Sequence, residues 1–271
     1  MTSLSSSRPL ALVTGASAGI GASFARALAA RGYDLALVAR RLDRLEELAK
    51  DLRARSTIEA FPIQADLSLA EAHLPVMAAL KERGRSVDML VNNAGFSIPK
   101  TFAATLWAEQ RDFTMTLVMA VAGLTHAVLP DMLARGRGSI VNVSSMTALS
   151  PGGAGHTLYP AAKAFVLKFS LSLDAEVRTK GVRVTCVIPG FTESEFSLAN
   201  GTRGVLDKTP RNFMMTAEAV VQATLKGNDR GHAVVIPGLH NQIAAGLMKY
   251  LPDRLVTAII RGAAEKYRVE D

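Results

Sequence analysis

Seven short apolar runs recur along the chain, and each is rich in leucine or β-branched residues. They are Leu10–Thr14, Leu35–Val38, Ile58–Ile63, Val87–Val91, Ser139–Ser144, Val182–Ile188 and Ala233–Ile236. The stretches between these runs repeat apolar residues with a helical period. The clearest of them are Ile20–Arg31, Leu42–Arg55, Leu69–Arg83 and Phe165–Thr179. Short apolar runs bounded by such stretches predict strands that alternate with helices.

This alternation is typical of an α/β fold, in which a doubly wound parallel sheet carries helices on both faces. No linker or charge block divides the chain after its first residues. We therefore expect a short N-terminal extension over residues 1–9 and one domain over residues 10–271. Because ligands of such sheets bind beyond the carboxyl ends of the strands, candidate chemistry should lie where each apolar run ends.

Composition favours a globular protein in a reducing compartment. Of the 271 residues, 49% are hydrophobic and 20% are charged, which is enough to bury a substantial core. The single cysteine, Cys186, excludes an internal disulfide. Because the N-terminal residues MTSLSSSRP lack the pattern of a signal peptide, we expect a cytoplasmic protein. The net charge of +7 suits an anionic partner, but the basic residues are scattered, so no nucleic acid is expected.

The first apolar run leads into the segment Thr14-Gly-Ala-Ser-Ala-Gly-Ile-Gly21, which has two interpretations. Its G-x-S-x-G part matches the nucleophile elbow of α/β-hydrolases, but that motif needs an earlier strand for its oxyanion loop, and only about a dozen residues precede this one. The alternative is a phosphate cradle, in which glycines admit a pyrophosphate to the backbone and to a helix N-terminus. The position at the first turn favours the cradle.

The end of the second apolar run predicts which dinucleotide the cradle would hold. In NAD sites an acidic residue about 20 positions after the glycines binds the ribose hydroxyls, whereas arginine accommodates the 2′-phosphate of NADP. Here the sequence reads Val38-Ala39-Arg40-Arg41, with two guanidinium groups and no carboxylate. We therefore expect NADP (NADPH) as the cofactor, with Arg40 as the leading phosphate contact and Arg41 as the second.

Six segments in the expected order make the chain resemble the classical short-chain dehydrogenase/reductase family. They are TGASAGIG at residues 14–21, Ala65-Asp66-Leu67, Asn92-Asn93-Ala94-Gly95, Ser144-Ser145, Tyr159-Pro-Ala-Ala-Lys163 and Pro189-Gly190. The resemblance implies a Rossmann-type sheet of seven strands and a nicotinamide cofactor. It also implies hydride transfer between a carbonyl and an alcohol, in a homodimer or homotetramer.

The resemblance assigns three catalytic residues. Tyr159 would act as general acid/base toward the substrate oxygen and Ser145 would hydrogen-bond that oxygen. Lys163 would hold the nicotinamide ribose and lower the pKa of Tyr159 below its usual value near 10. Pro160 suits the first position of a helix, which would place Tyr159 at the helix entry and Lys163 about one turn further on. Without the other segments, a Tyr-x-x-x-Lys pair would indicate only a helix surface.

The resemblance also implies a set of cofactor contacts. Asp66 would lie on the adenine side, Asn92 would steady the central sheet, and the segment from Pro189 to Ser194 would meet the nicotinamide carboxamide. The full set is Gly15, Ser17, Gly19, Ile20, Gly21, Arg40, Arg41, Asp66, Asn92, Ala94, Gly95, Tyr159, Lys163, Pro189, Gly190, Thr192 and Ser194. No metal site is expected.

One family residue is missing. The family carries an asparagine in the helix before the fifth strand, where it holds a water in the proton relay to the lysine, and Leu117 occupies that position here. A leucine side chain cannot hydrogen-bond water, and the neighbouring Thr116 would point about 100° away around a helix. Either the relay runs through backbone carbonyls and other waters, or the chain is an NADP-binding scaffold or redox sensor with little turnover. The three intact catalytic positions favour an enzyme.

Two further segments bear on substrate and partners. Residues 191–215 resemble the family's substrate lid, and their apolar side chains would line a pocket or pack against the sheet. These side chains are Phe196, Leu198, Leu206, Phe213, Met214 and Met215. His156 would touch substrate or remain a solvated loop residue. The helical segment over residues 240–268 carries apolar stripes, which would cover the core, the pocket or an interface rather than a membrane surface.

Together these observations predict an NADP(H)-dependent carbonyl reductase or alcohol dehydrogenase. Its substrate would be a moderately apolar small-molecule ketone or aldehyde, or the corresponding secondary alcohol.

Overall fold

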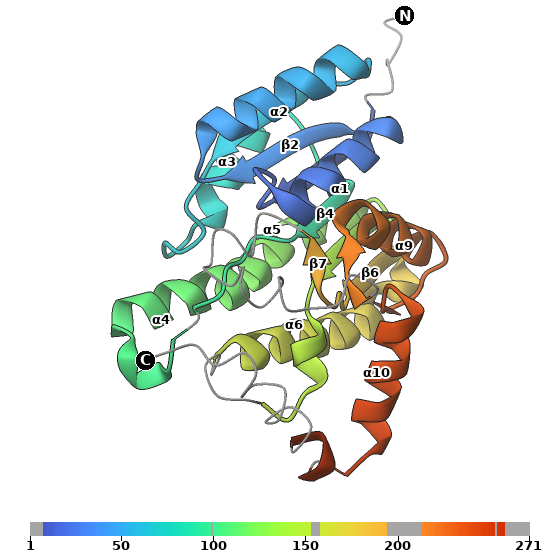
Figure 1. Ribbon diagram of the computed structural model, residues 1–271. Helices are drawn as coiled ribbons and strands as arrows, with labels where there is room; N and C mark the ends of the chain where they lie inside the picture. The colour runs from blue at the N-terminus through green and yellow to red at the C-terminus, as the bar shows by residue number, and fades with distance from the viewer. Residues whose placement is uncertain (1–7, 99, 153–157, 194–212, 253, 258–271) are drawn as a thin grey trace, which may run out of the picture.

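A seven-stranded sheet forms the centre of the molecule (Figure 1). The computed structural model describes residues 8–98, 100–152, 158–193, 213–252 and 254–257. The strand order is β3-β2-β1-β4-β5-β6-β9, and every neighbouring pair is parallel. The strands are β1 (Leu10–Thr14), β2 (Asp34–Ala39), β3 (Ala60–Gln64), β4 (Met89–Asn92), β5 (Gly138–Val143), β6 (Val182–Val187) and β9 (Val234–Val235). The predicted doubly wound parallel α/β fold is confirmed.

The helices around this sheet are α1 (Gly19–Ala30), α2 (Leu42–Arg55), α3 (His73–Glu82), α4 (Trp107–Thr114), α5 (Ala120–Ala134), α6 (Leu158–Val177), α9 (Ala217–Asp229) and α10 (Leu239–Tyr250). Helices α1, α2 and α9 cover one face of this sheet and α3, α5 and α6 the other, while α4 and α10 pack against other helical segments. Short 3₁₀ turns lie at Phe102–Ala104, Met146–Leu149 and Arg178–Lys180, and a small parallel pair joins β7 (Thr192–Glu193) to β8 (Met215–Thr216).

The pleat of β1 shows how the two core layers form. Ala11 and Val13 pack with α1, α2 and α9 on one face of the sheet. Leu10 and Leu12 pack with α3, α5 and α6 on the other face. Successive side chains of a strand point to opposite faces, so a strand buried on both faces must be apolar throughout. This requirement explains why the seven runs could be recognised in the sequence.

One predicted helix start was wrong, and another was shifted by two residues. Helix α3 begins at His73 rather than Leu69, because residues 69–72 form turns and Glu71 adopts a φ of 57°. Helix α6 begins at Leu158, so Tyr159 lies at the helix entry as predicted, and Pro160 is its third residue rather than its first. A proline is compatible with that position because the first-turn N–H groups have no partner inside the helix. Tyr159 and Lys163 therefore share one continuous helix.

A buried polar network braces the middle of the sheet. Asn92 Nδ2 donates to Asn142 Oδ1 at 2.9 Å and to Thr125 Oγ1 at 3.1 Å, and Asn142 Nδ2 donates to Ser170 Oγ at 2.9 Å. These bonds join β4 and β5 to α5 and α6. The side chain of Asn92 therefore serves the sheet, as the resemblance implied, and faces the core rather than the glycine turn. The direction of its side chain does not support the prediction that Asn92 contacts the cofactor.

A π-helical turn over Met115–Met119 joins α4 to α5 and contains Leu117. The whole helical segment Trp107–Ala134 is long and apolar enough to cross a membrane, with a mean hydropathy of 1.6, but Leu124 is fully buried in the core layer under the sheet. Leu117 is also fully buried and packs with Phe113 and Ala162. A Cβ atom on Gly95 would lie 3.5 Å from Leu117 Cγ. Leu117 therefore packs among apolar side chains and does not take part in a polar relay.

We predict that Leu117→Asn, which restores the family residue, destabilises the protein. The substitution buries an amide among apolar side chains at a cost of about 2–4 kcal/mol. For a chain of this size the melting temperature should fall by about 5–15 °C, measured by circular dichroism. Leu117→Met, which conserves volume, should cost less than about 1.5 kcal/mol. An unchanged melting temperature in Leu117→Asn would show that the site holds a polar partner for the amide.

Candidate active site

The turns that follow six strands meet at one edge of the sheet. Parallel strands bring their carboxyl ends together, so the segments after β1, β2, β3, β4, β5 and β6 converge although they are far apart in sequence. The strand order reverses beside β1, where β4 follows. This switch point is where open α/β sheets bind their ligands.

The glycine turn after β1 leaves a helix N-terminus free for an anion. Gly15 and Gly19 have φ values of 64° and 53°, which residues with side chains rarely adopt. A Cβ atom on Gly21 would collide with the Gly15 carbonyl oxygen, so the turn can close only with glycine there. Helix α1 follows Ala18, which provides no side-chain cap, and its first turn has no acidic residue. The N–H groups and the positive end of the helix dipole are therefore suited to a pyrophosphate.

Ser17 lies in this turn beside a cation. Arg41 donates from its Nη2 to Ser17 Oγ at 3.1 Å, which brings the end of β2 to the glycine turn. A nucleophilic serine would instead need a base such as histidine at its hydroxyl. The contact fits a cradle for phosphate and disfavours the hydrolase interpretation.

Arg40 and Asp66 lie at the ends of β2 and β3 on this edge of the sheet. Gln64 Nε2 donates to the Arg40 carbonyl at 2.9 Å, which links the ends of β2 and β3. Desolvation acts to raise the pKa of Asp66, but hydrogen bonds from the Ser68 backbone and hydroxyl, together with the charge of Arg40, outweigh it and lower this pKa. Asp66 is therefore ionised at neutral pH and accepts hydrogen bonds from Ser68 near the Arg40 guanidinium.

A clamp between β1 and β4 holds the glycine turn in place. Thr14 Oγ1 donates to the Val91 carbonyl at 3.2 Å and accepts the N–H groups of Asn93 and Ala94 at 2.9 and 3.0 Å. Asn93 Nδ2 donates to the carbonyls of Thr14 and Gly15 at 3.0 and 3.3 Å. The sequence analysis did not assign Thr14 or Asn93 a role. Their polar side chains directly at two strand ends were the signal that could have revealed it.

Ser145 and Tyr159 come together from β5 and α6. Ser145 Oγ accepts the Thr147 N–H at 3.2 Å at the start of a 3₁₀ turn, which fixes the serine at the end of β5. Burial raises the pKa of Tyr159 to about 12, and the hydrogen bond with Ser145 opposes that rise. The phenol is therefore protonated at neutral pH, which is the form that can give a proton to a substrate oxygen.

Lys163 lies one turn after Tyr159 and is almost completely buried. Its Nζ donates to the Val143 carbonyl at 2.9 Å, and its own carbonyl accepts the Ser144 hydroxyl at 2.7 Å. Burial lowers the pKa of Lys163 to about 8. The ammonium lies 5.7 Å from the centre of the Tyr159 ring.

The prediction that Lys163 lowers the pKa of Tyr159 is wrong for this arrangement of the chain. Desolvation of the phenol is the largest influence on it, and the Lys163 ammonium is directed at a backbone carbonyl. The sequence spacing placed the two residues correctly but carried no information about burial.

The segment after β6 closes the far side of the edge. The Met146 N–H donates to the Pro189 carbonyl at 3.0 Å, and Thr192 Oγ1 donates to the Gly190 carbonyl at 3.1 Å. A Cβ atom on Gly190 would collide with Asn241 Oδ1 of α10, so a larger residue there would displace this side chain. Ser194, His156 and most of the predicted lid, including Phe196, Leu198 and Leu206, lie outside the described residues, as does the end of the predicted C-terminal segment beyond residue 257.

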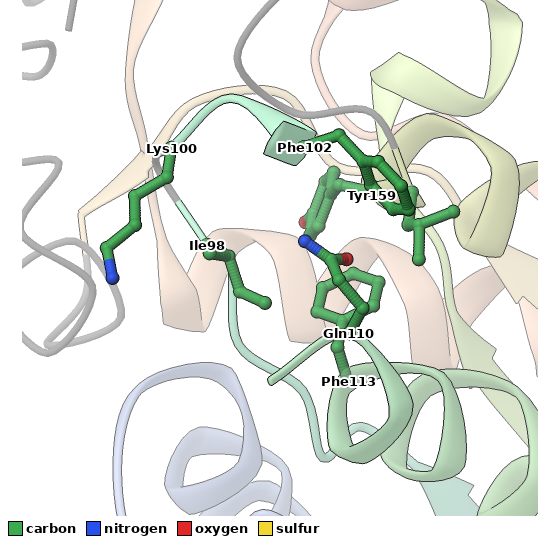
Figure 2. A pocket seen from close by; sticks show the side chains of 7 residues that line it. Ile98, Lys100, Phe102, Gln110, Phe113 and Tyr159 are labelled. Atoms are coloured by element: carbon green, nitrogen blue, oxygen red, sulfur yellow. The ribbon is translucent and has the colours of Figure 1, made fainter. Parts of the chain in front are cut away.

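A small hollow of about 10 Å³ that opens to solvent lies beside Tyr159. Figure 2 shows side chains from the loop after β4, from α4 and from the start of α6 around it. Its lining residues are Ile98, Lys100, Phe102, Gln110, Phe113, Leu158 and Tyr159. The sequence analysis placed the pocket at the lid and did not assign the residues between 98 and 113, because their spacing resembles ordinary loop and helix sequence.

Comparison with known proteins identifies the same family that the sequence motifs resemble. The family model for short chain dehydrogenases matches residues 9–202. An uncharacterised oxidoreductase from Myxococcus xanthus is 36% identical over 252 residues, which cover 93% of this chain and 96% of the relative. A short-chain dehydrogenase from Sphingobium yanoikuyae, solved with NADPH, has a TM-score of 0.78 at 34% identity and covers 90% of this chain and 96% of its own.

A second solved structure is an alcohol dehydrogenase from Comamonas testosteroni that is described as specific for bulky-bulky ketones. It has a TM-score of 0.75 at 34% identity, and the match covers 90% of this chain and 95% of its own. The glycine turn, the Ser145–Tyr159–Lys163 arrangement and these matches agree with one another. The chain belongs to the short-chain dehydrogenase family and is an oxidoreductase that uses a nicotinamide cofactor.

Proposed function

We propose that the protein is an NADPH-dependent reductase of small, moderately apolar ketones or aldehydes, which runs as an alcohol dehydrogenase in the reverse direction. The observation that carries this proposal is the hollow in which Tyr159 lies beside the apolar side chains of Phe102, Phe113 and Leu158. The bulky-ketone specificity named for the Comamonas testosteroni enzyme supports the same substrate class. A cytoplasmic location remains our expectation from the sequence.

The residues at the strand ends suit a bound dinucleotide. In our proposal Gly15, Ser17, Gly19, Ile20 and Gly21 hold the pyrophosphate, and Arg40 and Arg41 hold the 2′-phosphate. Asp66, Ala94 and Gly95 would lie along the adenosine half, and Lys163, Pro189, Gly190, Thr192 and Ser194 along the nicotinamide half. The free N-terminus of α1 supports the first assignment, and the contact between Arg41 and Ser17 supports the second.

The chain's own groups would then divide the work on the substrate. The bound cofactor supplies a hydride to the carbonyl carbon. Ser145 and Tyr159 both hydrogen-bond the carbonyl oxygen, which orients the carbonyl and stabilises the charge that develops on it. Tyr159 gives its proton to that oxygen, so the product is the neutral alcohol. In our proposal Lys163, whose ammonium is mainly protonated near neutral pH, holds the nicotinamide ribose.

Proton supply after turnover does not need the family asparagine. Leu117 faces apolar neighbours, whereas Lys163 Nζ contacts the Val143 carbonyl at the end of β5. We propose that backbone carbonyls and water near this lysine complete the relay. The scaffold alternative, which rests on Leu117, is less favoured, because Ser145, Tyr159 and Lys163 are all present and lie together at the site.

The proposed function is tested by measuring turnover with and without the Tyr159 hydroxyl. NADPH oxidation with a panel of ketones and aldehydes should be detectable, and Tyr159→Phe should lower kcat/KM by about 10²–10⁴-fold because the general acid is lost. Tyr250→Phe, on the exposed face of α10, is the matched control and should behave as the parent. A parent that binds NADPH but reduces no carbonyl compound would instead support the scaffold alternative.

Cofactor choice is tested by the two arginines. The parent should have a higher kcat/KM with NADPH than with NADH. Arg40→Ala or Arg41→Ala should reduce this preference by about 10- to 100-fold, as expected for a lost charge-assisted hydrogen bond. Arg183→Ala, near the amino end of β6 at the opposite edge of the sheet, is the control. A preference that is the same in all four proteins would contradict the assignment of the 2′-phosphate site.

We also propose a homodimer or homotetramer. Met119 and Phe165 lie on adjoining helical segments and expose 53% and 37% of their surface. The most apolar 18-residue stretch of Trp107–Ala134 is only 39% buried within the chain. Exposed apolar surface of this kind marks subunit contacts. Sedimentation equilibrium should give a dimer or tetramer, and Phe165→Arg should shift it toward the monomer. A monomeric parent at micromolar concentration would contradict this proposal.

A further inference from the structure

One buried polar side chain interrupts the apolar wall of the hollow beside Tyr159. Gln110, on α4, is only 6% exposed and lines the hollow with Ile98, Phe113 and Leu158. Figure 2 shows its amide entering the same space as the Tyr159 ring. A side-chain amide that is this buried is expected to have hydrogen-bond partners in or at the mouth of the hollow.

A neighbouring hydroxyl fixes the direction of this amide. Gln110 Nε2 donates to Thr105 Oγ1 at 2.8 Å. The Thr105 hydroxyl uses its own proton to donate to the Phe102 carbonyl at 2.7 Å, so toward the glutamine it can act only as acceptor. The amide nitrogen therefore faces Thr105, and the side-chain oxygen is left to serve as a hydrogen-bond acceptor.

The oxygen of this amide has no donor in the part of the chain that the structure describes. Gln110 makes one side-chain hydrogen bond there, through its nitrogen, and its backbone carbonyl accepts the Thr114 hydroxyl at 2.8 Å. An acceptor that is already oriented and lines a pocket is suited to a group that donates a hydrogen bond. Among uncharged ligand groups, a hydroxyl is such a donor.

The cation at the rim does not indicate an anionic ligand. Lys100 lines the same hollow, but its Nζ contacts Glu109 Oε1 at 3.2 Å and its side chain is 52% exposed. Glu109 Oε2 also accepts the Leu106 N–H at 2.9 Å, which holds this carboxylate beside the lysine. The charge of Lys100 is therefore largely compensated, and the polar feature inside the hollow is the neutral amide.

We propose that Gln110 is a specificity-determining residue that accepts a hydrogen bond from a hydroxyl group on the substrate. The preferred substrates are then hydroxy ketones or hydroxy aldehydes whose remaining skeleton is apolar. This inference rests on the proposed carbonyl reductase function and adds a second recognition point to it. The first point, at Tyr159 and Ser145, binds the reacting carbonyl, and Gln110 binds a separate oxygen of the same molecule.

The test compares matched substrates. Each set contains a ketone with a hydroxyl one, two or three carbons from the carbonyl, its analogue with methyl in place of the hydroxyl, and its methyl ether. The ether keeps the oxygen but cannot donate a hydrogen bond. In at least one set the parent should have a kcat/KM about tenfold higher for the hydroxy ketone than for both analogues, the scale expected for one hydrogen bond in a pocket.

The variants assign this preference to one residue. Gln110→Met conserves volume and should abolish the preference while the kcat/KM for the methyl analogue stays within about threefold of the parent. Thr105→Val leaves the glutamine in place but removes the group that orients it, and should weaken the preference. Gln222→Met, on the exposed face of α9, is the matched control. If Gln110→Met is unstable by circular dichroism, Thr105→Val carries the test.

Two results would overturn the inference without touching the proposed function. These are carbonyl reduction with equal kcat/KM for all members of every set, or a preference that persists in both Gln110→Met and Thr105→Val. If the parent binds NADPH but reduces none of the ketones, the proposed function fails. Calorimetric binding of a diol and its matched monoalcohol to the complex with NADP⁺ then tests the hydroxyl site by itself, and equal affinities would overturn it.

Discussion

The contact between the Lys163 ammonium and the Val143 carbonyl is the interaction on which the active site depends. It takes a long flexible side chain out of water and fixes it across the gap between α6 and the end of β5. The Ser144 hydroxyl returns a second bond to the Lys163 carbonyl, so strand and helix are joined at both ends of the residue. Because Tyr159 lies one turn earlier on the same helix, this contact also sets the position of the phenol.

Burial of these groups has a chemical consequence. Desolvation keeps the phenol of Tyr159 protonated and lowers the pKa of Lys163 to about 8. A protonated phenol is the state from which a carbonyl reduction starts. In the same low-polarity surroundings, electrostatic interactions between the groups of the site and the substrate oxygen are stronger than in water. Leu117 belongs to this environment, because it fills the space beside Gly95 and Ala162 that a polar side chain could occupy only at a cost in stability.

The sequence predicted those features that depend on periodicity and local backbone chemistry. The seven runs are strands because each must be apolar on two faces, and the glycine turn was visible because positive φ angles and close packing require glycine. Pro160 is the third residue of α6 rather than the first, because a proline in the first turn is compatible with helical residues before it.

Features that depend on three-dimensional surroundings could not be predicted in this way. The raised pKa of Tyr159 follows from burial, which no spacing reveals. The role of Asn93 depends on the pairing of β1 with β4. The role of Gln110 depends on the position of α4 beside Tyr159. The π-helical turn at Leu117 lies inside a helical segment whose sequence shows no break.

The central claim is that these buried groups carry out hydride transfer in the protein as it stands, with leucine at position 117. A single-turnover experiment with excess protein and NADPH deuterated at the transferring position of the nicotinamide tests it most directly. We predict that mass spectrometry finds one deuterium on the carbinol carbon of the alcohol, in proportion to the NADPH consumed. Alcohol product without deuterium, or NADPH consumption without alcohol, would contradict the account.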